Sequence, residues 1–270
     1  MENTDIIKQS PVDLRELTWS RSVGSLASDG VFLKADKIIN GITYYLKLSN
    51  YDSFRGIFGH EAVNELIACR LGKLLGFPVV EGELIKSFVT IDGKEHFAYV
   101  FIAKSYRTTQ SRDSFENYYF SYRLSNEESP LDFCKRCNWG TQIYKMFIFD
   151  YLIINRDRHG ANLEVLKNSD IFLSPFFDNG LSFVCSYTDG IGLDTFSVLY
   201  DKPVNNFIGS RSLEKNLSFI DEKIVFNKLK ESDKLVLFAG LKGILAEEYF
   251  DKIWEIIWRR EQNVKIFRVI

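Results

Sequence analysis

A chain of 270 residues is long enough for one large domain or two lobes, and its 46% hydrophobic and 26% charged content is ordinary for a globular protein. A net charge of -2 and a pI near 6.0 argue against a broad basic face, so we expect no direct nucleic-acid binding. The start lacks the basic and apolar regions of a signal peptide, and no run approaches the roughly 18–20 apolar residues of a membrane helix. We therefore expect a cytoplasmic protein without a membrane span.

The first segment with a clear pattern is a loop of small residues followed by a predicted hairpin. Residues 20–30 are rich in Ser, Gly and Ala, and the β-branched or aromatic runs Val31–Lys34 and Ile42–Leu48 flank a turn at Gly41. Such a loop lets backbone N–H groups approach phosphates, although it matches neither G-x-x-x-x-G-K-[ST] nor a clean G-x-G-x-x-G. Lys47 lies among bulky apolar residues of the second run. We interpret it as a functional lysine, with a snorkelling edge lysine as the alternative.

The next element is a predicted helix over Gly59–Phe77. Apolar residues recur at helical spacing along it, Gly76 follows as a C-cap signal, and Pro78 comes just beyond. Glu61 and Glu65 lie one turn apart on this helix. They are either solvated glutamates of a polar face or candidates for a site.

A predicted meander of strands completes the N-terminal part of the chain. Val79–Leu84, Ser87–Ile91 and Phe97–Ile102 have strand patterns, with a turn at Asp92-Gly93. The sequence becomes polar and rich in Ser and Thr after Ser105. We therefore predict a lobe boundary here, with a β-rich N-lobe over residues 1–104 and a mainly helical C-lobe over residues 105–270.

Two polar clusters follow buried elements in the second half. Trp139–Ile154 has a helical apolar pattern and leads into Asp150–Asn162, which reads D-Y-L-I-I-N-R-D-R-H-G-A-N; we interpret its Asp150 as a structural acid. The predicted strand Ile171–Leu173 leads into Phe176–Gly180, which reads F-F-D-N-G. Dense polar groups directly after core segments are typical of an active-site loop.

Three oxygen-bearing residues in these clusters, Asp157, Asn162 and Asp178, suit a magnesium–nucleotide site. Magnesium takes one or two carboxylates and shares the rest of its shell with phosphate and water. The region 181–201 has no clear period, and Ile224–Leu229, Leu235–Leu245 and Glu247–Val264 are predicted as C-terminal helices.

The pair of motifs resembles a kinase family. D-x-x-x-x-N over Asp157–Asn162 is the spacing of the protein-kinase catalytic loop, and Asp178 falls at the position of the metal-binding aspartate. The form D-R-H-x-x-N followed by F-D-N-G is most similar to the bacterial HipA-like serine/threonine kinases, in the phosphatidylinositol-kinase-like branch. The resemblance implies an α+β, two-lobed protein-kinase-like fold.

The resemblance also implies ATP and Mg²⁺ as cofactors and assigns roles to particular residues. Asp157 would be the catalytic aspartate, and Asn162 and Asp178 would hold the metal and nucleotide. Lys47 would bind the phosphates, with Glu65 as its partner and Glu61 in reserve. His159 would act on phosphate or hydrogen-bond the loop backbone. The remaining implied nucleotide contacts are the loop serines Ser22, Ser25 or Ser28 and the connecting residues Ile102, Ala103 and Ser105.

These features lead to one main hypothesis and two alternatives. The main one is an ATP- and Mg²⁺-dependent kinase that acts on a serine or threonine of a protein, including itself. The first alternative is a lipid or small-molecule kinase, because D-R-H-x-x-N also occurs in lipid kinases; the second is an ATP-binding regulator without turnover. Longer HipA-like toxins carry an extra N-terminal subdomain that contacts an antitoxin, for which this chain has no room, so an antitoxin-type partner stays open.

Overall fold

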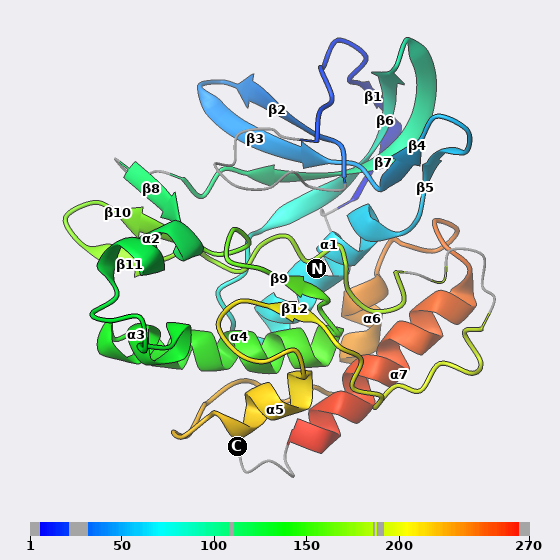
Figure 1. Ribbon diagram of the computed structural model, residues 1–270. Helices are drawn as coiled ribbons and strands as arrows, with labels where there is room; N and C mark the ends of the chain where they lie inside the picture. Colours follow the sequence, from blue (N-terminus) through cyan, green and yellow to red (C-terminus); the bar gives the residue numbers. More distant parts are fainter. Residues whose placement is uncertain (1–5, 22–31, 108–110, 186, 188–191, 265–270) are drawn as a thin grey trace.

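A computed structural model describes residues 6–21, 32–107, 111–185, 187 and 192–264, and it has two lobes (Figure 1). The upper lobe contains a five-stranded sheet of order β1-β6-β7-β3-β2 and the helix α1. Its elements are β1 (Ile6–Asp13), β2 (Lys34–Ile39), β3 (Ile42–Lys47), β4 (Asn50–Asp52), β5 (Gly56–Phe58), α1 (Glu61–Leu75), β6 (Gly82–Ile91) and β7 (Lys94–Lys104). The predicted α+β, two-lobed fold is confirmed.

The lower lobe is mainly helical, with short strands at its upper edge (Figure 1). Its first elements are β8 (Ser111–Ser114), α2 (Phe115–Tyr122), α3 (Pro130–Arg136), α4 (Gly140–Ile153), β9 (Asp157–Arg158), β10 (Glu164–Lys167) and β11 (Ile171–Leu173). They are followed by β12 (Asn205–Asn206), α5 (Leu213–Ser218), α6 (Asp233–Phe238) and α7 (Glu247–Val264). Within the described ranges, no helix combines the length and apolar character needed to cross a membrane.

The two hairpins of the sheet follow from their turn residues. Asn40 and Gly41 connect β2 to β3 with φ of 51° and 76°, and Asp92 and Gly93 connect β6 to β7 with φ of 50° and 75°. Two successive residues with positive φ match the right-handed twist of paired strands, so Asn-Gly and Asp-Gly are favoured there. Both predicted turns are confirmed, whereas β6 is one continuous strand where the sequence suggested two.

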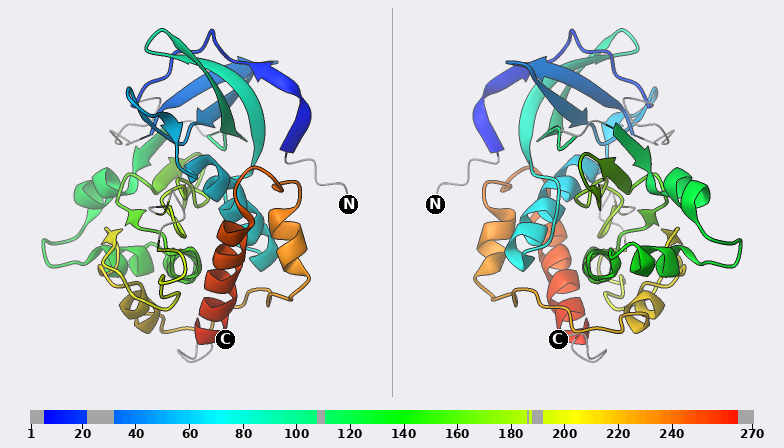
Figure 2. Two further views of the ribbon diagram at one scale, coloured as in Figure 1. Left: turned by 90° about the vertical axis from the view of Figure 1, so that its right-hand side faces the viewer. Right: turned by 90° about the vertical axis from the view of Figure 1, so that its left-hand side faces the viewer.

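The helix α1 joins the two lobes through its packing. Nearly all of its residues are buried, and Gly76 ends it with φ of 73°, as the C-cap signal predicts. Arg70 of this helix donates to the carbonyl oxygens of Leu237 at 2.7 Å and Ala239 at 2.9 Å, at the end of α6. Both views of Figure 2 place α6 beside α1. The helix is thus anchored on the lower lobe as well as under the sheet.

Buried apolar side chains form two clusters, one on each face of the sheet. The outer face of the sheet has its own small core, which includes Leu46, Val89 and Val100. A larger core runs from the inner face of the sheet through α1 into the helices of the lower lobe. The sheet therefore has a small core on its outer face and shares the larger core with α1 and the lower lobe.

Replacing Gly72 of α1 by alanine is expected to destabilise the protein by about 1–3 kcal/mol, because the added Cβ would overlap the side chain of Val79. Gly140, in the first turn of α4, is the matched control, since a Cβ there would come no closer than 3.7 Å to its neighbours. Urea unfolding of both variants tests this. Equal free energies of unfolding for Gly72→Ala and the parent would contradict the close packing.

The C-terminal third differs from the sequence prediction in two places. Residues 224–229 form no helix, and the helix predicted over Leu235–Leu245 is the shorter α6, which ends at Phe238. The short helix α5 was not predicted, whereas α7 has the predicted bounds. Ile224 and Leu229 of this stretch are buried in the core, whereas Val225 is exposed. The apolar pattern thus indicated the burial of the two end residues without indicating the backbone conformation.

Candidate active site

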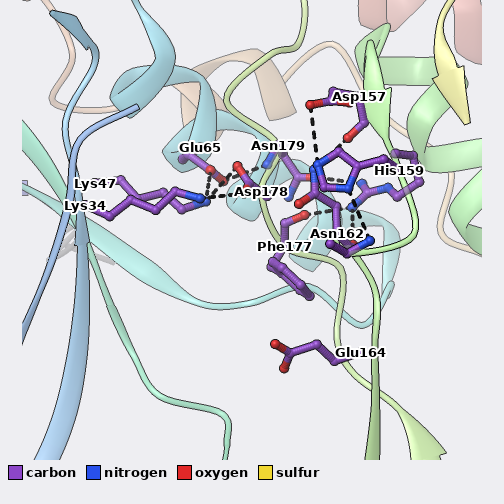
Figure 3. Close-up of polar contacts among 12 residues, drawn as sticks. Lys34, Lys47, Glu65, Asp157, His159, Asn162, Glu164, Phe177, Asp178 and Asn179 are labelled. Atoms are coloured by element: carbon purple, nitrogen blue, oxygen red, sulfur yellow. Dashed lines mark hydrogen bonds and ion pairs between the residues drawn. The ribbon is translucent and has the colours of Figure 1, made fainter. Parts of the chain in front are cut away.

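A cleft of about 730 Å³, including its open mouth, lies between the sheet and the lower lobe. Its apolar lining includes Val80, Phe101, Ala103 and Phe177. Its charged lining includes a group that Figure 3 shows close together, namely Lys34, Lys47, Glu65 and Asp178. A largely apolar cleft with a few convergent charged groups is typical of a ligand-binding site.

The lysine and glutamate singled out in the sequence form an ion pair. Lys47 Nζ lies 2.6 Å from Glu65 Oε1, and their side chains are 17% and 5% exposed. Lys47 ends β3 between the fully buried Leu46 and Leu48, so the alternating strand geometry turns its side chain into the cleft. Glu61 does not take part in this pair, because its carboxylate accepts a hydrogen bond from the Asn50 backbone N–H at 3.2 Å. Burial raises the pKa of Glu61.

Asp178 is held by two lysines, one on each carboxylate oxygen. Its Oδ1 lies 3.0 Å from Lys47 Nζ, and its Oδ2 lies 3.1 Å from Lys34 Nζ. Burial alone would raise the pKa of Asp178, but the charges and hydrogen bonds of Lys47 and Lys34 outweigh burial, so this pKa lies well below its usual range. Burial likewise lowers the pKa of Lys47, but Asp178 and Glu65 outweigh it and raise that pKa. Asp178 and Lys47 are therefore both charged at neutral pH.

The backbone of Asp178 is in the left-handed region, with φ of 58°. This conformation is uncommon outside glycine, although Asp and Asn adopt it more readily than other residues. Next to it, the backbone N–H of Asn179 donates to Glu65 Oε2 at 3.0 Å. Glu65 therefore fixes both Lys47 and the segment that carries Asp178.

The depressed pKa of Asp178 predicts a pH dependence of stability. The unfolded carboxyl takes up a proton near its ordinary pKa of about 4, whereas the folded one stays ionised to lower pH. Its stabilising contribution is therefore present above about pH 4 and is lost as the pH falls toward the folded pKa. We expect the difference in free energy of unfolding between the parent and Asp178→Asn to shrink between pH 6 and pH 3, as measured by urea unfolding. If this difference stays constant between pH 6 and pH 3, the Asp178 ion pairs do not lower the pKa of that carboxyl.

The segment 155–162 is held by Asp150, in the last turn of α4. Ile154 ends this helix with φ of 52°, which is rare for a β-branched residue and turns the chain sharply toward the cleft. Asp150 then accepts a hydrogen bond from Asn155 Nδ2 at 3.0 Å and two from Arg158, from Nη2 at 2.7 Å and Nε at 3.1 Å. The predicted structural role of Asp150 matches this geometry.

Arg158 joins the segment 155–162 to the Asp178 segment. Its guanidinium donates to the carbonyl oxygen of Phe177 at 2.7 Å, to Asn179 Oδ1 at 2.8 Å and to the carbonyl oxygen of Asn162 at 3.2 Å. The Arg158 side chain is only 2% exposed. Its planar fork of five donors suits these three acceptors from two segments, and lysine could not replace it.

Asp157 lies at the start of β9, with both carboxylate oxygens near polar groups. Oδ1 accepts a hydrogen bond from Asn205 Nδ2 at 2.9 Å, since β9 pairs with β12 in parallel, and Oδ2 lies 3.7 Å from His159 Nε2. His159 Nδ1 accepts a hydrogen bond from the Ala161 backbone N–H at 3.2 Å, so a neutral ring carries its proton on Nε2, toward Asp157. His159 thus contacts the loop backbone and also faces the aspartate.

Asn162 is placed so that its amide oxygen remains available. Its Nδ2 donates to the Asp157 carbonyl oxygen at 2.8 Å, and its Oδ1 is buried without a hydrogen-bond partner among the described residues. A buried oxygen of this kind is costly unless a ligand takes it. The donor set of Asn162 and Asp178 therefore fits Mg²⁺, provided that a cation can reach an Asp178 oxygen now bonded to a lysine.

The residues predicted to contact the nucleotide base are only partly at the cleft. Ala103 and Lys104 line it, whereas Ile102 points to the opposite face of β7 and packs with the outer core. The backbone N–H of Ser105 donates to the Thr43 carbonyl oxygen at 2.8 Å. Ile102 and Ala103 are neighbours on β7, so their side chains face opposite sides of the sheet. Ser22, Ser25 and Ser28 lie outside the described residues.

The sequence analysis missed several residues around the cleft. Lys34 is one, and Tyr106 and Arg107, which follow the predicted connection, are others. Arg107 binds Glu164 through Nη2 at 2.6 Å and Nε at 3.0 Å, and its guanidinium lies 4.8 Å from the centroid of the Tyr45 ring. Asn205 is a further example, and Asn179 was part of the F-F-D-N-G motif but received no role. The contacts of these residues are with partners distant in the sequence, which a local pattern does not indicate.

Fold and site together define the class of structure. A β-rich lobe supplies a strand lysine paired with a helix glutamate, and a helical lobe supplies Asp157, Asn162 and Asp178 from two adjacent loops. This arrangement is that of the two-lobed protein-kinase-like fold.

Comparison with solved structures identifies particular relatives of this fold. The Helicobacter pylori proinflammatory kinase CtkA matches with a TM-score of 0.63 and 15% identity, over 96% of this chain and 97% of that one. Shewanella oneidensis MR-1 HipA, solved with HipB and its operator DNA, gives a TM-score of 0.41 at 14% identity, over 91% of this chain and 60% of that one. WaaP in complex with acyl carrier protein gives 0.39 at 12% identity, over 93% and 89%.

No protein-family model matches the sequence, and a search of curated proteins finds no significant match. The likeness to CtkA shows that this chain has the fold of a kinase, as the resemblance in the sequence implied.

Proposed function

We propose that this protein is an ATP- and Mg²⁺-dependent kinase of HipA-like type that phosphorylates serine or threonine in a protein, including its own chain. The observation that supports this most is the ion-pair network of Lys47, Glu65 and Asp178 in a cleft beside Asp157. Phosphoryl transfer asks a protein mainly for positioning and charge, and this network supplies both.

Lys47 would bind the nucleotide phosphates, and Glu65 would hold it in place. The pair is nearly buried, so it keeps one geometry at little entropic cost when a ligand arrives. Asn162 and Asp178 would hold Mg²⁺, which when bound would neutralise charge on the transferring phosphoryl group. The apolar side of the cleft, with Val80, Phe101 and Ala103, would receive the base.

Asp157 would accept the proton of the attacking hydroxyl. Its Oδ1 is oriented by the Asn205 amide, which leaves Oδ2, on the side of His159, for the acceptor hydroxyl. His159 would orient this end of the carboxylate through its Nε2 proton. The choice of a serine or threonine acceptor rests on the resemblance of D-R-H-x-x-N and F-D-N-G to HipA-like kinases.

Intact-mass spectrometry after incubation with Mg-ATP tests the proposal. We expect added phosphate on the parent and none on Asp157→Ala or Asp178→Asn, with peptide mapping to locate the modified residue. Asp170→Asn, in an exposed turn between β10 and β11, is the control and should be phosphorylated like the parent. Absence of nucleotide binding by the parent in calorimetry would refute the proposal.

A further inference from the structure

Lys34 is a second cleft lysine for which the proposed roles leave no function. It begins β2 and is the direct cross-strand partner of Lys47 on β3, so both side chains leave the sheet on the same face. The Lys34 side chain is 12% exposed, and its ammonium binds Asp178 Oδ2 at 3.1 Å. Figure 3 shows the two lysines lying side by side and reaching the same carboxylate.

Neighbouring like charges on paired strands destabilise a sheet unless other charges compensate them. Here Asp178 and Glu65 provide that compensation, so the two lysines and two carboxylates balance. This balance has a consequence for ligands. A divalent cation that binds Asp178 competes with a lysine for a carboxylate oxygen, and that lysine then lies beside the cation with little solvent to screen their repulsion.

We propose that Lys34 couples the binding of the divalent cation to the binding of the nucleotide phosphates; this inference rests on the proposed function. A cation that takes Asp178 Oδ2 displaces the Lys34 ammonium. Because the Lys34 side chain is only 12% exposed, its charge is then stabilised by another anion in the cleft. A polyphosphate supplies that anion. The cation alone therefore binds weakly, and the cation and the polyphosphate each strengthen the binding of the other, as linkage requires.

Lys34 rather than Lys47 serves this purpose because of their different partners. Lys47 keeps Glu65 as a second carboxylate at 2.6 Å when Asp178 is engaged elsewhere. The structure shows Lys34 with Asp178 as its carboxylate partner. When a cation occupies the Asp178 carboxylate, Lys47 therefore still has Glu65 as its counter-charge. Lys34 has lost its carboxylate partner, so its ammonium gains most from a nearby phosphate.

Calorimetry with Mn²⁺ alone, the β,γ-imido analogue of ATP in EDTA, and both together tests this coupling. Lys34→Met and Lys34→Gln are expected to bind Mn²⁺ alone about tenfold more tightly, since one charge-assisted hydrogen bond no longer competes for Asp178. Both variants should bind the metal-free analogue about tenfold more weakly. Complex formation between metal and analogue in solution is the same for every variant, so it cancels in the comparison.

Two further variants complete the design. Lys34→Arg keeps the charge and should retain most of the parental coupling. Lys37→Met is the matched control on the same strand, because Lys37 pairs with Glu16 at 2.7 Å outside the cleft. It should bind all ligands like the parent. Thermal unfolding confirms that each variant is folded.

The outcomes separate the inference from the proposed function. If the parent binds the analogue with metal but the Lys34 variants bind Mn²⁺ alone no more tightly than the parent, Lys34 does not compete with the cation and the inference is overturned. If the parent fails to bind the analogue with or without metal, the proposed function itself fails. Tighter Mn²⁺ binding combined with weaker analogue binding is the result that supports the coupling.

Discussion

Replacing Asp157 by asparagine is expected to lower kcat about 10²–10⁴-fold, the usual loss when a positioned general base is removed. Asparagine keeps the shape and an acceptor oxygen for the Asn205 amide, so the loop should keep its conformation. The carboxylate that orients and deprotonates the acceptor hydroxyl would nevertheless be gone. Steady-state phosphorylation of an acceptor peptide, or the single-turnover rate of self-phosphorylation, measures the effect.

A separation of kcat from nucleotide binding makes this experiment specific. Asp157 has no part in the lysine network, so calorimetry should give similar nucleotide affinities for Asp157→Asn and the parent. Asp170→Asn again serves as the exposed control. Equal kcat for Asp157→Asn and the parent would show that a different group accepts the proton.

Replacing Asp150 by alanine is expected to cost about 3–5 kcal/mol in free energy of unfolding, because it leaves the Arg158 charge buried without its carboxylate. The two side chains are 1% and 2% exposed, so water cannot compensate. Urea unfolding followed by circular dichroism measures the loss. Asp251, which pairs with Lys234 at 2.8 Å while 61% exposed, is the control, and Asp251→Ala should cost no more than about 1 kcal/mol.

The double variant Asp150→Leu/Arg158→Met sharpens this prediction. Removing both charges eliminates the unpaired one, so the double variant should be more stable than the sum of the two single losses predicts. Activity should still fall, because Arg158 also holds the Phe177 and Asn162 carbonyl oxygens. If the loss in free energy of unfolding for the double variant equals the sum of the two single losses, the Asp150–Arg158 ion pair makes no contribution of its own, which would contradict the prediction.

The sequence was sufficient for the parts of the fold that local rules determine. Asn40-Gly41 and Asp92-Gly93 specify their turns, and Gly76 ends α1 as expected. The motif spacing singled out Asp157, Asn162 and Asp178 as candidate site residues, and the structure brings the segments that carry them close together. Lys47 and Glu65, proposed as partners from the resemblance, form an ion pair.

The remaining features depend on contacts between distant residues. Lys34 meets Asp178 across 144 positions, and Asn205 meets Asp157 across 48. No periodicity or spacing rule can indicate such a pair from one chain. The stretch 213–245 was misjudged for a related reason, because short helices and buried extended segments share the same apolar patterns.

The position of α1 couples the two lobes. The sheet has its own core, whereas α1 is fastened by Arg70 to the segment after α6 and shares the core of the lower lobe. The larger core nevertheless continues from α1 onto the inner face of the sheet, so α1 is packed against both lobes. Its Glu65 binds Lys47 of the sheet through one carboxylate oxygen and the Asn179 backbone N–H of the lower lobe through the other. A displacement of α1 would therefore shift the strand lysine and the Asp178 segment together.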